Sequence, residues 1–316
     1  MEQGGRSGKK MSAVMYIIYY LFFPGFVFAA AAGLVSGWID RKVTARIHWR
    51  AGPPWYQNFA DIIKLFGKDV IVPEKTSSAF LLAPFMGLLA AALSSAIIGM
   101  AFLSPEAGFI GDIIVVLYLL VIPAVCLIIG ASCSRNPLAS IGASREMKLV
   151  VGYELPFILI LLAVIVRSQG SIRLGEIINL QLAGGPNIAS VSGVLGFAAG
   201  ILCAQAKLGF VPFDAAEAEQ EIMGGALIEY SGAPLAFFKL TKAVMLYTMP
   251  VFLILLFWAD SLNPLSIAGK YVLILVIMIL IKNTNPRLRI DQALRFFWGP
   301  VSIAALLALI TAFMGY

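Results

Sequence analysis

Long apolar stretches alternate with short polar stretches along the whole chain, and their lengths predict helices that cross a membrane. Eight of these stretches suit helices of about 17–25 residues, the length that spans a bilayer. They cover residues 12–38, 79–103, 113–133, 149–166, 188–206, 235–258, 267–282 and 297–315. The pattern predicts an all-α, polytopic integral membrane protein in which residues 1–316 form a single membrane domain.

Residues 55–70, between the first two predicted spans, show helical spacing instead of continuous hydrophobicity. The apolar positions at this spacing are Trp55, Phe59, Ile62, Ile63, Phe66 and Val70. Polar residues, including Asp61 and Lys64, occupy much of the remaining surface. This is the pattern of an amphipathic helix that lies in the membrane interface. Periodicity alone leaves two roles open, a lipid anchor and a part of a partner's docking surface.

Composition supports the membrane assignment and charge gives its orientation. The chain is 60% hydrophobic and 13% charged, whereas a soluble domain carries roughly 25% charged residues. Of its 23 Lys and Arg residues, 15 lie in the odd-numbered loops and 6 on the other side. Because cytoplasmic loops carry the excess of basic residues, we expect cytoplasmic odd-numbered loops and external termini in a plasma-membrane protein. The net charge of +6 is thus explained without a nucleic-acid partner.

The residues that usually carry chemistry are sparse. Cys126, Cys133 and Cys203 fall in apolar runs without a CxxC pair, and His48 is the only histidine. No metal-ligand pattern, nucleophile–base set or nucleotide motif is present. We therefore expect no catalytic, metal-binding or cofactor-binding site in this chain, and we place any electron carriers in partner subunits.

The strongest chemical signal is the acidic connector, residues 209–232, which joins the fifth and sixth predicted spans. Its carboxylates are Asp214, Glu217, Glu219, Glu221 and Glu229. On a helix, Asp214, Glu217 and Glu221 would share one face. Crowding and partial burial would then raise their pKa values and let them exchange protons or pair with a passing cation. The alternative, a solvated acidic loop that docks on a basic partner, stays open.

Glu154 is a carboxylate inside the fourth predicted span, two residues before Pro156. A buried charge at such a position is costly and by default marks an ion or proton path. The alternative is that its side chain reaches the interface. Lys239 and Lys242, near the start of the sixth span, can pair with the acidic connector, although lysines near helix ends more often extend toward water.

The segment Pro286-Arg-Leu-Arg-Ile-Asp-Gln precedes the last predicted span on the cytoplasmic side. It contributes Arg287, Arg289 and Asp291. A general excess of cytoplasmic positive charge explains the arginines as well as a binding role does.

Four motifs together resemble the H subunit family of respiratory complex I. The resemblance extends to the corresponding membrane subunits of energy-converting nickel–iron hydrogenases and sulfane sulfur reductases. The first motif is Asp40-Arg-Lys, followed by Arg50-Ala-Gly-Pro-Pro and Ala60-Asp-Ile-Ile-Lys-Leu-Phe-Gly-Lys. The others are Gly152-Tyr-Glu, Pro212-Phe-Asp-Ala-Ala-Glu-Ala-Glu-Gln-Glu with Glu229-Tyr-Ser-Gly, and Pro286-Arg-Leu-Arg-Ile-Asp-Gln. They occur in the family's order over essentially the whole chain.

The resemblance implies a non-catalytic anchor that couples electron transfer to H⁺ or Na⁺ translocation. The implied ion path comprises Glu154, Asp214, Glu217, Glu219, Glu221, Glu229 and Lys239. The implied interface with the peripheral arm comprises Arg41, Lys42, Arg46, Arg50, Asp61, Lys64, Arg287, Arg289 and Asp291. The implied partners are hydrophilic iron–sulfur and large catalytic-type subunits, antiporter-like and small membrane subunits, and the lipid bilayer. Iron–sulfur clusters, and a nickel–iron centre in the hydrogenase alternative, are implied for those partners.

Departures from the family pattern favour a complex that does not use quinone. Quinone-using members usually carry Asn at the position of Pro54, Gln near that of His48 and Glu at that of Asp40. We therefore favour a sulfane sulfur reductase or hydrogenase of the archaeal type over a quinone-chamber subunit. A stand-alone secondary cation transporter is a further alternative, but the inverted repeats common in transporters are not evident.

Overall fold

The computed structural model describes residues 19–74 and 76–315, without the side chains of residues 107, 219 and 220. The long helices are α2 (Phe26–Ile47), α4 (Ala79–Leu103), α7 (Pro137–Arg167), α9 (Val191–Lys207), α11 (Gly232–Phe257) and α12 (Pro264–Thr284). The shorter helices are α3 (Gln57–Phe66), α5 (Asp112–Leu119), α6 (Ile122–Cys133), α8 (Leu174–Gly184), α10 (Glu219–Ile222), α13 (Ile290–Phe296) and α14 (Ser302–Phe313). Short helical turns are η1 (Pro105–Ala107), η2 (Asn187–Ala189), η3 (Ala215–Glu217), η4 (Gly225–Leu227) and η5 (Phe297–Val301).

The all-α, polytopic fold predicted from the sequence is confirmed within the described residues, which contain no strand. In the described part of the chain, seven helical segments are long and apolar enough to cross a membrane. The one remaining predicted span is the fifth, 188–206, which corresponds to α9. This helix has 17 residues, the lower limit for crossing a bilayer. The first predicted span begins at residue 12, and residues 12–18 lie outside the described part. The amphipathic helix predicted at 55–70 is α3.

Three spans differ in detail from the sequence-based boundaries. α7 begins at Pro137 rather than near residue 149, because Asn136 caps it by accepting a hydrogen bond from the Leu138 N–H at 2.8 Å. The third span is two helices, α5 and α6. The last span joins α13 to α14 through the π turn η5, which contains Pro300. The Ser302 hydroxyl donates to the Phe297 carbonyl at 2.7 Å and so satisfies a carbonyl in this turn.

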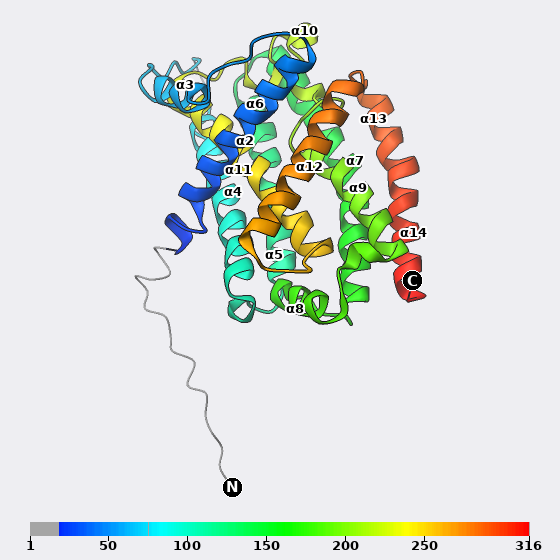
Figure 1. Ribbon diagram of the computed structural model, residues 1–316. Helices are drawn as coiled ribbons and strands as arrows, with labels where there is room; N and C mark the ends of the chain where they lie inside the picture. The colour runs from blue at the N-terminus through cyan, green and yellow to red at the C-terminus, as the bar shows by residue number, and fades with distance from the viewer. Residues whose placement is uncertain (1–18, 75, 316) are drawn as a thin grey trace.

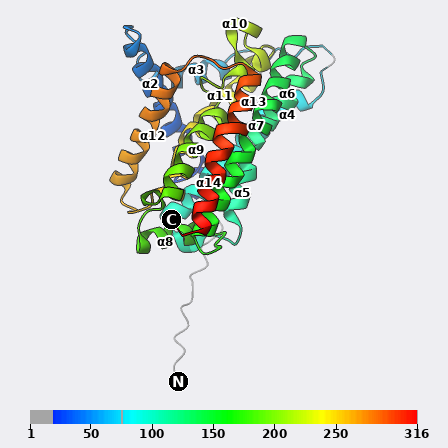
Figure 2. The ribbon, with the colours of Figure 1, turned by 90° about the vertical axis from the view of Figure 1, so that its right-hand side faces the viewer.

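The helices form one bundle around α11, whose residues are mostly buried. α2 packs on one side of α11 with α12 beside it, and α7, α9 and α14 pack together on the other side (Figures 1 and 2). One end of the bundle carries α3 and α10, and the opposite end carries α8 and the last turn of α14 (Figure 1). We call these the connector end and the α8 end.

At the α8 end, buried amide side chains close the C-terminus of α11. Gln181 Nε2 donates to the carbonyls of Leu255 and Leu256 at 2.8 and 3.1 Å, and Asn187 Nδ2 donates to the Leu256 carbonyl at 2.8 Å. The last carbonyls of a helix have no partner within the helix. These two side chains therefore let α11 end inside the protein.

At the connector end, small residues bring the acidic connector close to the spans. A Cβ on Gly142 of α7 would lie 2.5 Å from the Ala226 nitrogen and 2.9 Å from the Ala216 oxygen. Tyr230 stacks on Phe80 and donates from its hydroxyl to the Phe80 carbonyl at 3.1 Å. The connector is thus folded onto α4 and α7 instead of extending into solvent.

Candidate functional site

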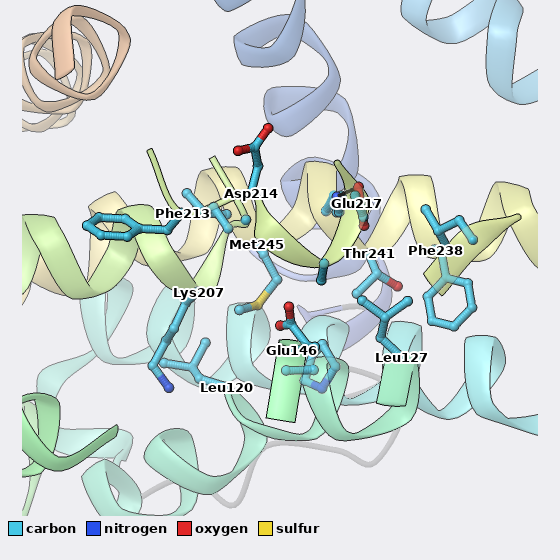
Figure 3. Close-up of a pocket in the computed structure, with 17 residues that line it drawn as sticks. Leu120, Leu127, Glu146, Lys207, Phe213, Asp214, Glu217, Phe238, Thr241 and Met245 are labelled. Carbon is cyan, nitrogen blue, oxygen red and sulfur yellow. Dashed lines mark hydrogen bonds and ion pairs between the residues drawn. The ribbon is translucent and has the colours of Figure 1, made fainter. Parts of the chain in front are cut away.

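A cavity of about 60 Å³ lies between the acidic connector and helices α6, α7, α9 and α11. We call it the inner cavity. Its charged lining residues are Glu146, Lys207, Asp214, Glu217 and Lys242. Most of the remaining lining is apolar, including Leu127, Phe238 and Met245 (Figure 3). A polar cavity of this size has room for a few water molecules.

Two charged residues of the inner cavity, Glu146 and Lys207, were not predicted from the sequence, and Glu146 is the carboxylate of the two. It is 7% exposed, and it points from α7 toward the connector (Figure 3). Within the described part of the chain it makes no hydrogen bond and no ion pair. A buried carboxylate without a partner is costly as an anion, so it suits a group that takes up and releases a proton.

A periodic signal could have revealed Glu146. Because the sequence predicted the fourth span from residue 149, Glu146 was assigned to a loop. The residues buried at helical spacing before that point are Ala139, Gly142, Ala143 and Glu146. This small-residue stripe continues the buried face of the span by two turns, and it includes the carboxylate.

Glu154, predicted as a path residue inside the membrane, pairs with Lys207 at the end of α9. Lys207 Nζ lies 2.8 Å from Glu154 Oε2, and the Lys207 side chain is 1% exposed. The ammonium also lies over the rings of Tyr153 and Phe157, 5.0 and 4.6 Å from their centroids. Removing one partner of such a buried pair typically costs about 3–5 kcal/mol, so this contact is a fixed element of the site.

Asp214 pairs with Arg287 from the loop between α12 and α13, at 2.8 Å. Its carboxylate points away from the inner cavity (Figure 3). Burial raises the pKa of the Asp214 carboxyl, while the Arg287 guanidinium opposes that rise. The predicted interface residue Arg287 is therefore in direct contact with the predicted ion path.

Glu217 and Glu221 each have a separate basic partner. Glu217 forms an ion pair with Lys242 of α11. Glu221 accepts a hydrogen bond from Arg145 of α7 at 2.6 Å, and its side chain is exposed. Lys239, which was predicted in the path, lines another hollow. The lysine that reaches the acidic connector is Lys242.

Two predicted path carboxylates remain, Glu229 and Glu219. Glu229 accepts a hydrogen bond from Asn136 Nδ2 at 2.5 Å and so ties the connector to the start of α7. Glu229 does not line the inner cavity. The side chain of Glu219 lies outside the described residues.

The expectation that Asp214, Glu217 and Glu221 share a helical face is wrong. The connector forms the short turn η3 and then α10, separated by Ala218 in an extended conformation. The break lets each of the three carboxylates meet a cation from a different element. Their charges are balanced mainly by Arg287, Lys242 and Arg145.

A second hollow, the flank groove, has a volume of about 280 Å³ and lies between α2, α3 and α11. Its polar lining residues are Asp40, Arg41, Asn58, Asp61, Lys239 and Lys242. Arg41 lies 3.4 Å from Asp61, and Asp40 pairs with Lys282 at 2.7 Å. The predicted interface residues Arg41 and Asp61 therefore hold α3 against α2.

The other predicted interface residues also lie at the connector end. Lys42 and Arg46 lie in the last two turns of α2, Arg50 follows that helix, and Lys64 is on α3. Nearby apolar side chains are exposed, among them Trp49 at 97% and Ile63 at 70%. Exposed basic and aromatic side chains side by side suit a protein or membrane interface.

A third hollow, the surface cavity, has a volume of about 270 Å³ and is strongly charged. It is lined by Arg145, Asp214, Glu221, Arg287, Arg289 and Asp291, among others. It brings three predicted interface residues, Arg287, Arg289 and Asp291, beside two predicted path residues, Asp214 and Glu221.

Nothing in the described part of the chain is arranged to hold a metal ion or cluster. Among residues 19–74 and 76–315, no group of three or more His, Cys, Asp or Glu side chains could do so. Cys126, Cys133 and Cys203 are free thiols. The charged groups that line the inner cavity and the surface cavity are carboxylates, ammonium groups and guanidinium groups.

Comparison with known protein families gives one match over nearly the whole chain. A family model described as NADH dehydrogenase matches residues 17–313. The match includes every helix that contributes to the three hollows.

Similar proteins come from three kinds of complex. Formate hydrogenlyase subunit 4 of Escherichia coli is 33% identical, with 92% of this chain and 97% of that protein covered. The H subunit of NADH-quinone oxidoreductase from Dehalococcoides mccartyi is 32% identical, with 94% and 86% covered. A chain in the solved structure of the membrane-bound sulfane sulfur reductase, an archaeal respiratory membrane complex, superposes with a TM-score of 0.85. That chain is 29% identical, with 94% of this chain and 99% of that chain covered.

Proposed function

Because the chain belongs to the NADH dehydrogenase family, we propose that it is the membrane anchor and coupling subunit of a complex I-like respiratory complex. In this role it has no catalytic centre of its own. A hydrophilic redox arm docks at its connector end, and electron transfer in that arm drives H⁺ or Na⁺ translocation. The observation that supports this most directly is the inner cavity, where an unpaired buried carboxylate lies among three ion pairs.

The docking role is supported by the position of the predicted interface residues. All of them lie at the connector end, around α3, the end of α2 and the loop before α13. Iron–sulfur subunits of the arm would meet this surface, and iron–sulfur clusters would belong to those subunits. In the hydrogenase alternative, a nickel–iron centre would belong to the large subunit.

The coupling role is supported by the continuity of charge from the surface inward. Arg287 and Asp214 join the surface cavity to the inner cavity. Glu146 lines the inner cavity, and so does Lys207, which pairs with Glu154 of the fourth predicted span. A charge change at the docking face can thus act on Glu146 through ion pairs that exchange partners. Such pairs act strongly in a poorly hydrated interior.

The share of each similar protein's length that this chain spans favours a sulfane sulfur reductase or hydrogenase complex over a quinone-reducing one. The chain spans 97% and 95% of two similar hydrogenase-type subunits and 99% of the sulfane sulfur reductase chain. It spans 86% of the similar complex I subunit. Together with the departures at Asp40, His48 and Pro54, this supports the archaeal type as the first choice.

The protein is a multi-pass membrane protein, and we propose the plasma membrane as its location. The basic residues concentrated at the connector end support a cytoplasmic position for that end. Both termini would then be external.

The flank groove supports a second candidate, a quinone-chamber subunit. The groove has polar groups at its mouth and apolar walls formed by Leu34, Ile62 and Leu246, which suits an amphiphile. Binding of a short-chain quinone analogue to the purified complex, lost on filling the groove with Gly37→Phe, would favour this candidate. A stand-alone cation transporter is the third candidate.

Purification in a mild detergent separates these candidates. Under the proposed function the chain co-purifies with iron–sulfur subunits and antiporter-like subunits. A lone chain that transports ions in vesicles without a redox partner would overturn the proposal in favour of the transporter.

A substitution at Glu146 tests the coupling role. In the intact complex, Glu146→Gln removes the proton-exchanging group, so ion translocation per electron should fall by about tenfold or more. Electron transfer with artificial donors should stay within about twofold of the unmodified complex, because no electron carrier is touched. Glu176→Gln, at the exposed start of α8, is the matched control. Normal translocation in Glu146→Gln would contradict the assignment.

A further inference from the structure

Lys242 has a position that no other described residue shares, because it lines both the inner cavity and the flank groove. It projects from α11, the central helix of the bundle. Its neighbours Thr241 and Lys239 each line only one hollow, the inner cavity and the flank groove respectively. The two hollows therefore meet at the Lys242 side chain.

Among the described side chains, the ammonium of Lys242 forms one ion pair, with Glu217 of the acidic connector. The Lys242 side chain is 40% exposed and that of Glu217 is 25% exposed. An ion pair with this much water around it contributes little stability and breaks readily. The Lys207–Glu154 pair on the opposite wall, with Lys207 1% exposed, is by contrast fixed by burial.

The charged groups around Lys242 offer it a second partner. On the inner side, Lys242 lines the same cavity as the carboxylates Glu146 and Asp214. Asp214 already has Arg287, so Glu146 is the inner carboxylate without a cation of its own. On the groove side, Asp40 pairs with Lys282 and Asp61 with Arg41, and Lys239 repels a second ammonium.

We propose that the Lys242–Glu217 ion pair is a gate between the flank groove and the inner cavity. In the closed state, seen in the structure, Lys242 lies at the junction of the two hollows and is bound to Glu217. In the open state the ammonium moves inward to Glu146, and water from the groove becomes continuous with water in the inner cavity. The role of the gate in controlling ion entry rests on the proposed function. The existence of a barrier between the flank groove and the inner cavity does not.

Thiol accessibility measures the barrier directly. Thr241 is buried in the wall of the inner cavity, and its hydroxyl donates only to the Phe237 carbonyl of its own helix. Thr241→Cys, in a complex whose Cys126, Cys133 and Cys203 are alanine, places one reporter thiol behind the gate. The probe is hydroxyethyl methanethiosulfonate, which is uncharged and therefore not steered by the lysines. Mass spectrometry of the peptide that contains residue 241 gives the modification rate.

Lys242→Met keeps most of the length of the side chain and removes its charge, so the junction opens more often. We expect the modification rate to rise by about fivefold, the change that loss of a weak ion pair produces. Lys239→Met removes the same charge one turn away and should change the rate by less than about twofold. Lys242→Arg should restore a slow rate, because it can still pair with Glu217.

Equal rates in Lys242→Met and Lys239→Met would overturn the gate. If the Lys242→Met complex does not assemble, Glu217→Gln breaks the same pair from the connector side and should give the same increase. Ion translocation by the unmodified complex is measured in parallel. No translocation would overturn the proposed function and leave the accessibility result standing, so the two failures are distinguishable.

Discussion

At the scale of single residues, the described carboxylates of the acidic connector each have a different partner. Asp214 meets Arg287, Glu217 meets Lys242 and Glu221 meets Arg145. Glu229 meets the neutral amide of Asn136. Three of the connector carboxylates are therefore paired with a cation, and among the described carboxylates that line the inner cavity the one without an ion pair is Glu146 on α7. A site that must respond to small changes in its surroundings needs such an uncompensated group.

Asp214 and Glu176 predict pH effects of opposite sign. Burial raises the pKa of Asp214 above its ordinary value of 3.8, so its folded form holds a proton that the unfolded form releases. Its contribution to stability is therefore greatest at acid pH and is lost as the pH rises through the folded pKa. Hydrogen bonds from Ser171 and Arg173 lower the pKa of Glu176 below 4.5. Its contribution is present above that value and is lost as the pH falls.

Thermal unfolding of the purified complex checks these signs. As the pH rises from about 4 to 7, the Tm of Asp214→Asn should rise relative to the Tm of the unmodified protein. Over the same pH range, the Tm of Glu176→Gln should fall relative to the Tm of the unmodified protein. Parallel pH profiles for the two variants would contradict the assignment of burial as the dominant effect at Asp214.

At the scale of elements, the site depends on how closely the connector approaches α7. Gly142 allows the backbone of η3 and η4 to contact the helix directly. One turn farther along the same face, Glu146 meets the inner cavity. The fit of small residues against the connector therefore fixes the distance between Glu146 and the ion pairs around it.

Gly142→Ala should destabilise the protein by about 1–3 kcal/mol, because the added methyl group overlaps the backbone at Ala226 and Ala216. Gly269→Ala on α12 is the matched control, since a Cβ there meets no atom within 4 Å. In a helix interior that change should stabilise by up to about 1 kcal/mol. Denaturant unfolding of the purified protein in detergent measures both. Equal effects would show that the connector does not pack on Gly142.

At the scale of the whole molecule, the two ends of the bundle differ in chemistry. The connector end holds the basic residues, α3 and the three hollows. The α8 end is closed by Gln181 and Asn187, which cap α11. The charged hollows that suit a partner thus lie at the connector end, whereas buried amide side chains cap the central helix at the α8 end.

Cysteines at the two ends of α12 test the orientation. Leu265→Cys lies at the α8 end, where Leu265 is 80% exposed, and Asn285→Cys lies at the connector end. If the connector end is cytoplasmic, a membrane-impermeant thiol reagent should label residue 265 in intact cells. Residue 285 should be labelled only after permeabilisation and removal of peripheral subunits. The reverse pattern would show that the predicted orientation is wrong.

The sequence by itself determined the membrane class, the helical architecture and the segments that carry charge. These follow from local properties, because the lengths of apolar runs and the spacing of residues along a helix do not depend on distant contacts. The motifs around Asp40, Glu154, Asp214 and Arg287 were likewise sufficient to identify the family.

Only the tertiary structure decided which charges meet. Glu146 was hidden because Asn136 starts α7 earlier than hydrophobicity indicates. Lys242, rather than Lys239, reaches Glu217 because neighbouring positions on α11 face different hollows. Partners such as Asp214 and Arg287 are far apart in the chain and come together only when the connector folds back onto the spans. The energy of a charge depends on what surrounds it in three dimensions, so an unpaired carboxylate cannot be told from a paired one by sequence alone.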